Sequence, residues 1–100
     1  MLKKRYFKTK DEYEVTFELP ELPNEAKEAV LVCEANGWEP IAMKKSKGAF
    51  TVKMRMPANG RYQYRYLINN SEWVNDDAAD AYEPNEHGTQ NSVVETFTAN

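Results

Sequence analysis

The feature that most constrains the fold is an apolar alternation with a period of two, which recurs in three stretches of the chain. Residues 13–19 read YEVTFEL, residues 49–57 read AFTVKMRMP, and residues 61–68 read RYQYRYLI. Successive side chains of a β-strand point to opposite faces, so this period is typical of strands with one buried face. Helical signal is weak, because helix formers gather only in the short stretch 24–29.

Shorter apolar runs and strong turn signals complete the pattern. Further strands are expected at residues 29–34, 72–75 and 92–98. Asn-Gly pairs at residues 36–37 and 59–60 are among the strongest turn signals that a sequence can carry. Short strands with turns about every ten residues predict an all-β fold, an antiparallel β-sandwich of about seven strands.

The remaining segments are expected to be connections. Residues 19–28 contain two prolines, residues 42–48 are mainly polar, and residues 76–91 are rich in turn formers. A chain of 100 residues is typical of one domain, and we assign the sandwich to residues 11–100. Residues 1–10 are basic and are expected to form a disordered terminus outside it.

Charge alternates in blocks along the chain. Residues 1–10, 11–40, 41–68 and 69–100 carry net charges of +5, −8, +7 and −7, which sum to −3. Basic blocks can indicate nucleic-acid binding, but acidic blocks of similar size flank these and leave little net field for a phosphate backbone. We therefore favour the interpretation that oppositely charged segments become neighbours in a sheet, and we expect no nucleic-acid partner.

Composition also limits location and membrane association. No apolar run approaches the roughly 20 residues of a membrane helix, and no apolar region follows the basic N-terminus as in a secretory signal. A single cysteine excludes an internal disulfide. We expect a cytoplasmic protein without a membrane partner.

Catalytic and metal chemistry find little support. Asp76, Asp77 and Asp80 cluster in one loop, but a small sandwich offers no deep cleft to tune paired carboxylates, and acidic loops are usually solvated. His87 is the only histidine, which is too few for a typical zinc site. Cys33 lies in an apolar strand and is interpreted as an inert core thiol. No catalytic residue, metal or cofactor is predicted.

Two tryptophans at turns or strand ends suggest a different kind of site. Trp38 follows the Asn-Gly turn, and Trp73 lies in the short strand at 72–75. Flat aromatic rings can stack on the apolar faces of sugars, while amides and guanidinium groups bond to the hydroxyls. The polar groups available for this are those of Asn36, Gln63, Arg65, Asn75 and Asn91. The alternative is that both tryptophans cap the ends of the core, and composition does not separate the two interpretations.

Motifs between Val15 and Val94 add a specific resemblance. The pieces are VTFELP, AVLVCEANGWEP, GRYQYRYLIN and EWVNDDAADAYEPNEHGTQNSVV, and they stand in this order. Together they resemble the isoamylase-type early-set domain, which is carbohydrate-binding module family 48. This family includes the glycogen-binding domain of AMP-activated protein kinase beta subunits and the N-terminal domain of glycogen-branching and debranching enzymes. The resemblance implies an immunoglobulin-like sandwich.

The resemblance also implies a glucan site. Trp38 and Trp73 would be the stacking pair, and Arg65 would take the position of a basic residue that bonds sugar hydroxyls. The alternation of residues 61–68 agrees, because inward-facing tyrosines would leave Arg65 facing outward.

Three further site residues rest on the resemblance alone. Asn91 matches an asparagine before the last strand, and Thr89 matches a polar contact two residues earlier. His87 stands where the kinase domains have an apolar residue that threads into the glucan ring, so this chain departs from the family there.

We therefore expect non-catalytic binding of α-1,4-linked glucan such as glycogen, starch or malto-oligosaccharide, by a monomer or weak dimer. One alternative is a protein-interaction module that docks on a glucan-metabolising enzyme. Another is a stand-alone relative of the N-terminal domain of a branching enzyme or glycoside hydrolase, although this chain is too short to encode their catalytic barrel.

Overall fold

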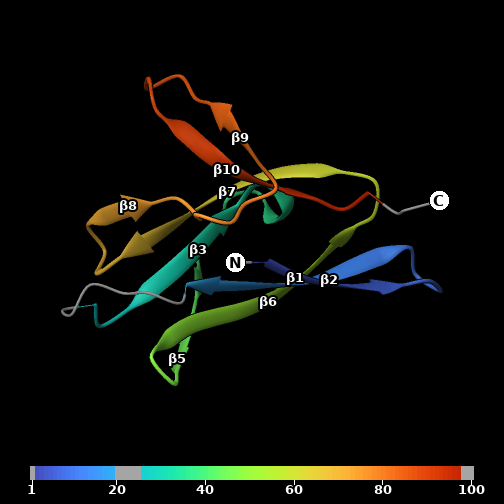
Figure 1. Cartoon of the computed structure of the whole chain (residues 1–100), viewed down its shortest axis with the longest axis horizontal. Helices are drawn as coiled ribbons and strands as arrows, with labels where there is room; N and C mark the ends of the chain where they lie inside the picture. The colour runs from blue at the N-terminus through green and yellow to red at the C-terminus, as the bar shows by residue number, and fades with distance from the viewer. Residues whose placement is uncertain (1, 20–25, 98–100) are drawn as a thin grey trace.

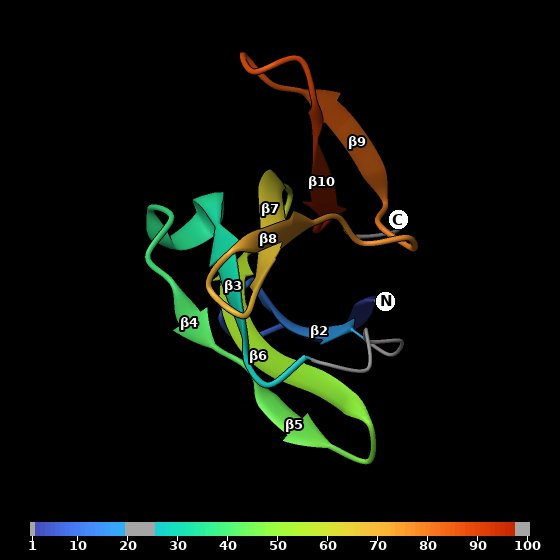
Figure 2. The same ribbon diagram turned by 90° about the vertical axis from the view of Figure 1, so that its left-hand side faces the viewer.

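The computed structural model describes residues 2–19 and 26–97, which form two antiparallel sheets packed face to face (Figures 1 and 2). The fold is thus the predicted all-β, immunoglobulin-like sandwich. The strands are β1 (Leu2–Phe7), β2 (Glu12–Leu19), β3 (Ala29–Cys33), β4 (Ile41–Ala42), β5 (Lys44–Ser46), β6 (Ala49–Pro57), β7 (Arg61–Ile68), β8 (Glu72–Val74), β9 (Ala81–Pro84) and β10 (Gln90–Glu95). No helix in these two ranges is long and apolar enough to cross a bilayer.

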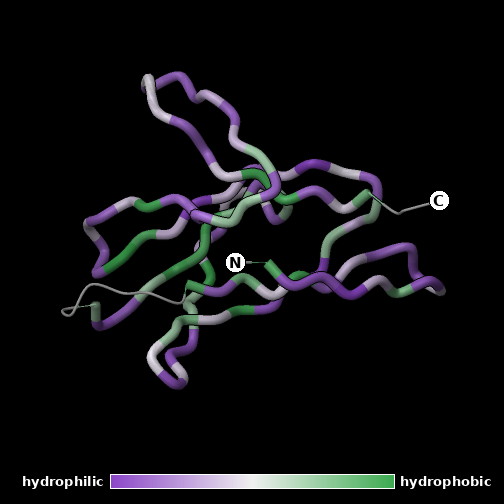
Figure 3. The backbone as a smooth tube through the Cα atoms, viewed as in Figure 1, coloured by the Kyte–Doolittle hydropathy of each residue, from purple (hydrophilic) through white to green (hydrophobic). Residues whose placement is uncertain are grey.

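The two sheets differ in how their strands connect. One has the order β1-β2-β6-β5, and the other has the order β4-β3-β7-β10-β9, with β8 paired to β7. Hydrophobic positions concentrate where the two sheets face each other, whereas the hairpin of β9 and β10 projects outward and ends in a hydrophilic turn (Figure 3). This hairpin and the outer face of β7 become important for the candidate site.

The core confirms the period-two predictions. Phe17 from β2 and Tyr64 from β7 are fully buried, and their rings meet across the sandwich edge to face with centroids 4.9 Å apart. Tyr64 also contacts the ring of Tyr66 at 5.7 Å. Edge-to-face pairs of this kind add about 0.5–1.5 kcal/mol beyond area burial. The aromatic contacts therefore fix which face of β7 points inward.

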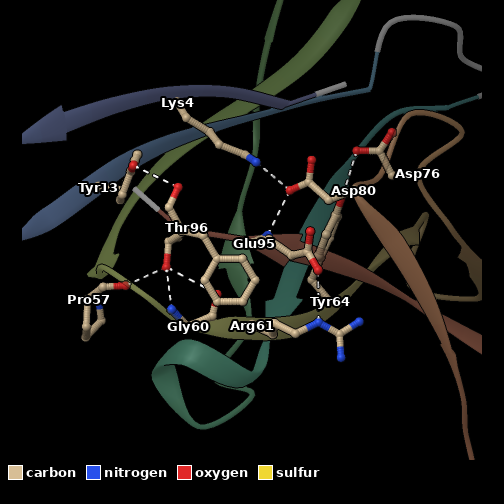
Figure 4. Close-up of polar contacts among 11 residues, drawn as sticks. Lys4, Tyr13, Pro57, Gly60, Arg61, Tyr64, Asp76, Asp80, Glu95 and Thr96 are labelled. Atoms are coloured by element: carbon tan, nitrogen blue, oxygen red, sulfur yellow. Dashed lines mark hydrogen bonds and ion pairs between the residues drawn. The ribbon is translucent and has the colours of Figure 1, made fainter. Parts of the chain in front are cut away.

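The expectation that the first ten residues are disordered is wrong for the described part, because Leu2–Phe7 form β1. This strand pairs with β2 along its whole length. Lys4 lies opposite Val15, whose side chain is in the core. The ammonium group of Lys4 forms an ion pair with Asp80, directly before β9 of the other sheet (Figure 4). Tyr6 packs on Tyr13 with ring centroids 5.1 Å apart. Pairing, stacking and an inter-sheet ion pair together hold the segment.

The prediction that oppositely charged segments become neighbours is confirmed. The acidic strand β2 lies between the basic strands β1 and β6, so that Glu14 is flanked by Arg5 and Arg55 in one row. At the other sheet, the Arg61 guanidinium bonds Glu83 at 2.7 Å and Glu95 at 3.0 Å. Opposite charges in cross-strand positions each contribute about 0.2–1 kcal/mol, so they set strand order more than total stability.

Two of the predicted connections contain strands. Residues 42–48 include the end of β4 and all of β5, whose hairpin with β6 turns at Lys47 and Gly48, both with positive φ. Residues 76–91 contain β9 and the start of β10. Strands β4, β5 and β9 are short, lie at sheet edges and bury little, so they carry no apolar alternation. In the predicted connection 19–28, residues 20–25 lie outside the described residues.

Asp76 is the second departure from expectation, because it is not solvated but only 3% exposed. Its carboxylate accepts hydrogen bonds from the hydroxyls of Tyr64 at 2.9 Å and Tyr66 at 3.1 Å, and its amide donates to the Ser92 hydroxyl at 2.9 Å. Burial opposes ionisation, but donors that include the Ala78 amide and the Tyr64 hydroxyl lower the pKa of the carboxyl below its ordinary value. Asp76 therefore joins the segment after β8 to β7 and β10.

Replacement of Asp76 by alanine is expected to lower the free energy of unfolding by about 2–4 kcal/mol, because two buried tyrosine hydroxyls lose their acceptor. Urea denaturation followed by circular dichroism measures this. Asp77 is exposed, so Asp77→Ala serves as the matched control and should change stability by less than about 0.5 kcal/mol. Equal effects of the two substitutions would contradict the assigned role.

The lowered pKa of Asp76 also predicts a pH dependence. A carboxyl whose pKa is lower when folded stabilises the protein above its unfolded pKa of about 3.9, and this stabilisation is lost as pH falls through the folded pKa. The stability advantage of the wild type over Asp76→Asn should therefore be constant above about pH 5 and shrink below about pH 4. Urea titrations from pH 7 to 2.5 test this, and an advantage that persists unchanged at pH 2.5 would refute it.

Candidate functional site

The outer face of β7 carries the polar groups that the sequence pointed to. Tyr64 and Tyr66 are fully buried, so Gln63 and Arg65 face away from the core, as predicted from the alternation. On one side of β7, β8 places Trp73 directly opposite Leu67. Side chains of directly paired residues share a face, so Trp73 and Arg65 lie on the same outer surface.

Arg65 and Trp73 contact each other on this surface. The guanidinium carbon of Arg65 lies 5.5 Å from the centre of the Trp73 ring, within the range of a cation–π interaction. Trp73 keeps 49% of its surface exposed. The Nε atom of Arg65 is buried and has no hydrogen-bond partner among the described residues. The pair thus places a half-exposed flat ring beside a guanidinium group.

A second group of site residues forms a chain of side-chain amides. Asn91 donates from Nδ2 to Oε1 of Gln63 at 2.8 Å, and Asn85 donates from Nδ2 to Oδ1 of Asn91 at 3.2 Å. Thr89 bonds Asn85 through its hydroxyl and its backbone amide. The structure therefore brings Asn91 and Thr89 together, and Gln63 connects them to the strand that carries Arg65.

Trp38 occupies a separate turn. It follows the 3-10 turn η1 (Glu34–Asn36) and has a left-handed backbone with φ of 68°, directly after Gly37 at 75°. The Trp38 amide donates to the carbonyl of Cys33 at 2.9 Å. A positive φ is costly for a bulky residue, and such strain tends to gather at functional sites. The Trp38 side chain is 42% exposed.

Sheet pairing places the two tryptophans on opposite sides of Arg65. Cys33, which anchors the Trp38 turn, pairs with Tyr64 from the β3 side of β7, whereas Trp73 pairs with Leu67 from the β8 side. Three residues of strand separate these positions, or about 10 Å along β7. No ring contact or hydrogen bond joins the Trp38 side chain to the other site residues within the described ranges.

His87 lies in the turn between β9 and β10, two residues before Thr89, at the end of the projecting hairpin (Figure 1). Its imidazole is 78% exposed, and Nε2 lies 3.8 Å from a Glu86 carboxylate oxygen. Its backbone amide donates to Oδ1 of Asn85 at 2.9 Å. His87 thus contributes to the turn by its backbone, and its side chain is not brought to either tryptophan.

The described residues do not form the paired-carboxylate, metal or reactive-thiol sites that were considered from the sequence. Asp76 is buried against tyrosines, while Asp80 bonds Lys4 and the backbone amide of Glu95, so the acidic loop is not one cluster. No group of three potential metal ligands gathers within residues 2–19 and 26–97. Burial raises the pKa of the Cys33 thiol to about 11, which keeps it protonated and unreactive near neutral pH.

Three residues that contribute to this surface were not predicted as site residues. Gln63 was noted only as a polar candidate, and Asn85 was not singled out. Asn85 stands three residues before Gly88 in the loop PNEHG, a pattern typical of an Asx turn, so turn chemistry offered a signal for it. Glu34 was also missed, although its carboxylate accepts a hydrogen bond from the Gln63 backbone amide at 3.1 Å and connects the Trp38 turn to β7.

Comparison with known proteins gives one family and one fold. Residues 21–99 match the family described as the glycogen recognition site of AMP-activated protein kinase. No curated protein matches the sequence. Among solved structures, enterochelin esterase from Shigella flexneri is similar with a TM-score of 0.73 and 13% identity. The match covers 95% of this chain but 32% of the esterase chain, so it shows a shared fold only.

Proposed function

Because the chain belongs to the glycogen-recognition family of AMP-activated protein kinase, we propose that it binds α-1,4-linked glucan without catalysing a reaction. The observation that carries this proposal is the pairing of Arg65 with the half-exposed ring of Trp73 on the outer face of β7. A glucose unit needs both an aromatic surface for its C–H face and donors for its hydroxyls, and this pair supplies both.

In the proposed mode of binding, Trp38 and Trp73 stack on sugar rings on either side of Arg65. The strand positions that hold the two tryptophans are offset by about 10 Å along β7 and lie on opposite sides of it, so a ligand that contacts both would be an oligosaccharide rather than a single sugar. Asn91 and Thr89 extend the polar edge toward the hairpin. His87, at the hairpin tip, would contact only a chain long enough to reach beyond the sheet.

A second candidate function is docking on a protein partner such as a glucan-metabolising enzyme. It is favoured by exposed aromatics away from the candidate site, since Phe97 is 54% and Tyr6 41% exposed. Tyr13 connects the two, because its ring packs on Tyr6 and its hydroxyl donates to the Phe97 carbonyl. Gel filtration with and without maltoheptaose separates the two functions, because glucan-independent association would favour docking.

Removal of the stacking surface gives the main test. We expect Trp73→Ala to weaken binding of maltoheptaose by about 1–3 kcal/mol, or roughly 5- to 150-fold, with little change in thermal stability. Isothermal titration calorimetry measures the affinity, and Phe97→Ala is the matched control because it removes an exposed aromatic elsewhere. Because the ligand is neutral, added salt should have little effect.

Two results would count against this assignment. Unchanged affinity in the double variant Trp38→Ala/Trp73→Ala would show that the glucan binds elsewhere. A steep loss of affinity between about 50 and 200 mM salt would indicate a polyanionic ligand instead.

A further inference from the structure

The amide chain on the outer face has a fixed direction. An asparagine or glutamine side chain can usually be turned either way, because its oxygen and nitrogen are similar in shape. Here Oδ1 of Asn85 accepts hydrogen bonds from the backbone amides of His87 at 2.9 Å and Thr89 at 3.2 Å. Backbone amides only donate, so the atom of Asn85 that faces them must be the oxygen.

The orientation of Asn85 in turn sets the orientations of the side-chain amides of Asn91 and Gln63. With its oxygen held by the turn, Asn85 presents Nδ2 to Oδ1 of Asn91. Asn91 therefore presents Nδ2 to Oε1 of Gln63. The oxygen of Gln63 accepts from Asn91, and the Gln63 Nε2 group, which can only donate, makes no hydrogen bond to the described residues.

The free donor of Gln63 lies beside another free donor. Gln63 and Arg65 are two residues apart on the same face of β7, so their Cα atoms are about 7 Å apart, within reach for two long side chains. Arg65 Nε is buried without a partner. The Gln63 oxygen would be a ready acceptor for it, but the amide chain turns that oxygen toward Asn91.

We propose that Asn85 is a positioning residue that keeps Gln63 as a hydrogen-bond donor, so that Gln63 Nε2 and the guanidinium group of Arg65 together select a ligand that supplies acceptor oxygens. In a glucan, these would be hydroxyl oxygens of one glucose unit. This inference rests on the proposed glucan function. It adds Gln63 to the residues that contact the ligand and Asn85 to those that orient them.

The substitution Asn85→Asp tests the direction of the hydrogen bonds from Asn85 through Asn91 to Gln63. The introduced carboxylate still accepts from the two backbone amides, so the turn keeps its hydrogen bonds, but it cannot donate to Asn91. Asn91 must then turn to donate toward residue 85, and Gln63 must turn to donate toward Asn91. The Gln63 oxygen then faces outward beside Arg65, which gains an internal acceptor and becomes less available to a ligand.

We expect Asn85→Asp and Gln63→Met each to lower the affinity for maltoheptaose by about tenfold, the effect typical of one lost hydrogen bond. If Asn85 acts through Gln63, the double variant should be no weaker than Gln63→Met alone. Gln90→Glu is the matched control for charge, because it adds one negative charge to an exposed position in the same hairpin and should leave the affinity unchanged. Full additivity in the double variant, or unchanged affinity in Asn85→Asp, would overturn the proposal.

A measurement without ligand separates this proposal from the proposed function. In the wild type, NMR should show slow exchange with water for an Asn91 side-chain amide proton and fast exchange for those of Gln63. In Asn85→Asp, the Gln63 protons should become the protected ones. If this reversal occurs but maltoheptaose does not bind, the glucan assignment fails and the amide orientation stands. If maltoheptaose binds and no reversal occurs, the role of Asn85 is refuted.

Discussion

The buried carboxylate of Asp76 is the interaction on which the candidate site depends. It accepts hydrogen bonds from Tyr64 and Tyr66, both of which belong to the inner face of β7. With these tyrosines held inward, alternation leaves Gln63 and Arg65 on the outer face. Asp76 also follows β8 by two residues, so the same contact fixes where β8, and with it Trp73, lies along β7. A buried polar contact thereby positions an exposed surface.

Charge complementarity has a different role, which is to hold the first sheet together. Strand β2 is acidic on its outer face and lies between the basic strands β1 and β6. At the inner side, Lys4 of β1 reaches Asp80 in the loop before β9. In the sequence, the basic blocks resemble a nucleic-acid footprint. Pairing of acidic with basic strands largely neutralises this charge, which agrees with a neutral ligand for the outer face of the other sheet.

Sequence alone predicted the parts of the fold where burial imposes a pattern. The alternation in residues 61–68 predicted the outward position of Arg65, and the resemblance predicted the family. The short edge strands β4, β5 and β9 escaped prediction because they bury little and so show no alternation. Asp76 was misjudged because a carboxylate enters a core only when partners distant in sequence satisfy it, and Tyr64 and Tyr66 could not be assigned to it without a structure. Asn85 escaped for a related reason, since an amide chain exists only after strands have paired.

The projecting hairpin of β9 and β10 makes the ligand affinity of the candidate site depend on whether the hairpin is closed. Among the described residues, strand β9 pairs only with β10, and the turn that follows β9 carries Asn85. The Tyr82 hydroxyl and the Arg61–Glu83 ion pair also hold β9 to the sandwich. Peripheral hairpins can open locally without global unfolding. If the β9–β10 hairpin opens, the side-chain amide of Gln63 loses the orientation that Asn85 and Asn91 give it, while Trp73 and Arg65 stay in place. The apparent affinity for a ligand would then be the intrinsic affinity scaled by the fraction of molecules with a closed hairpin. Temperature, or a partner that holds the hairpin closed, would therefore change binding without touching the proposed ligand-contacting residues.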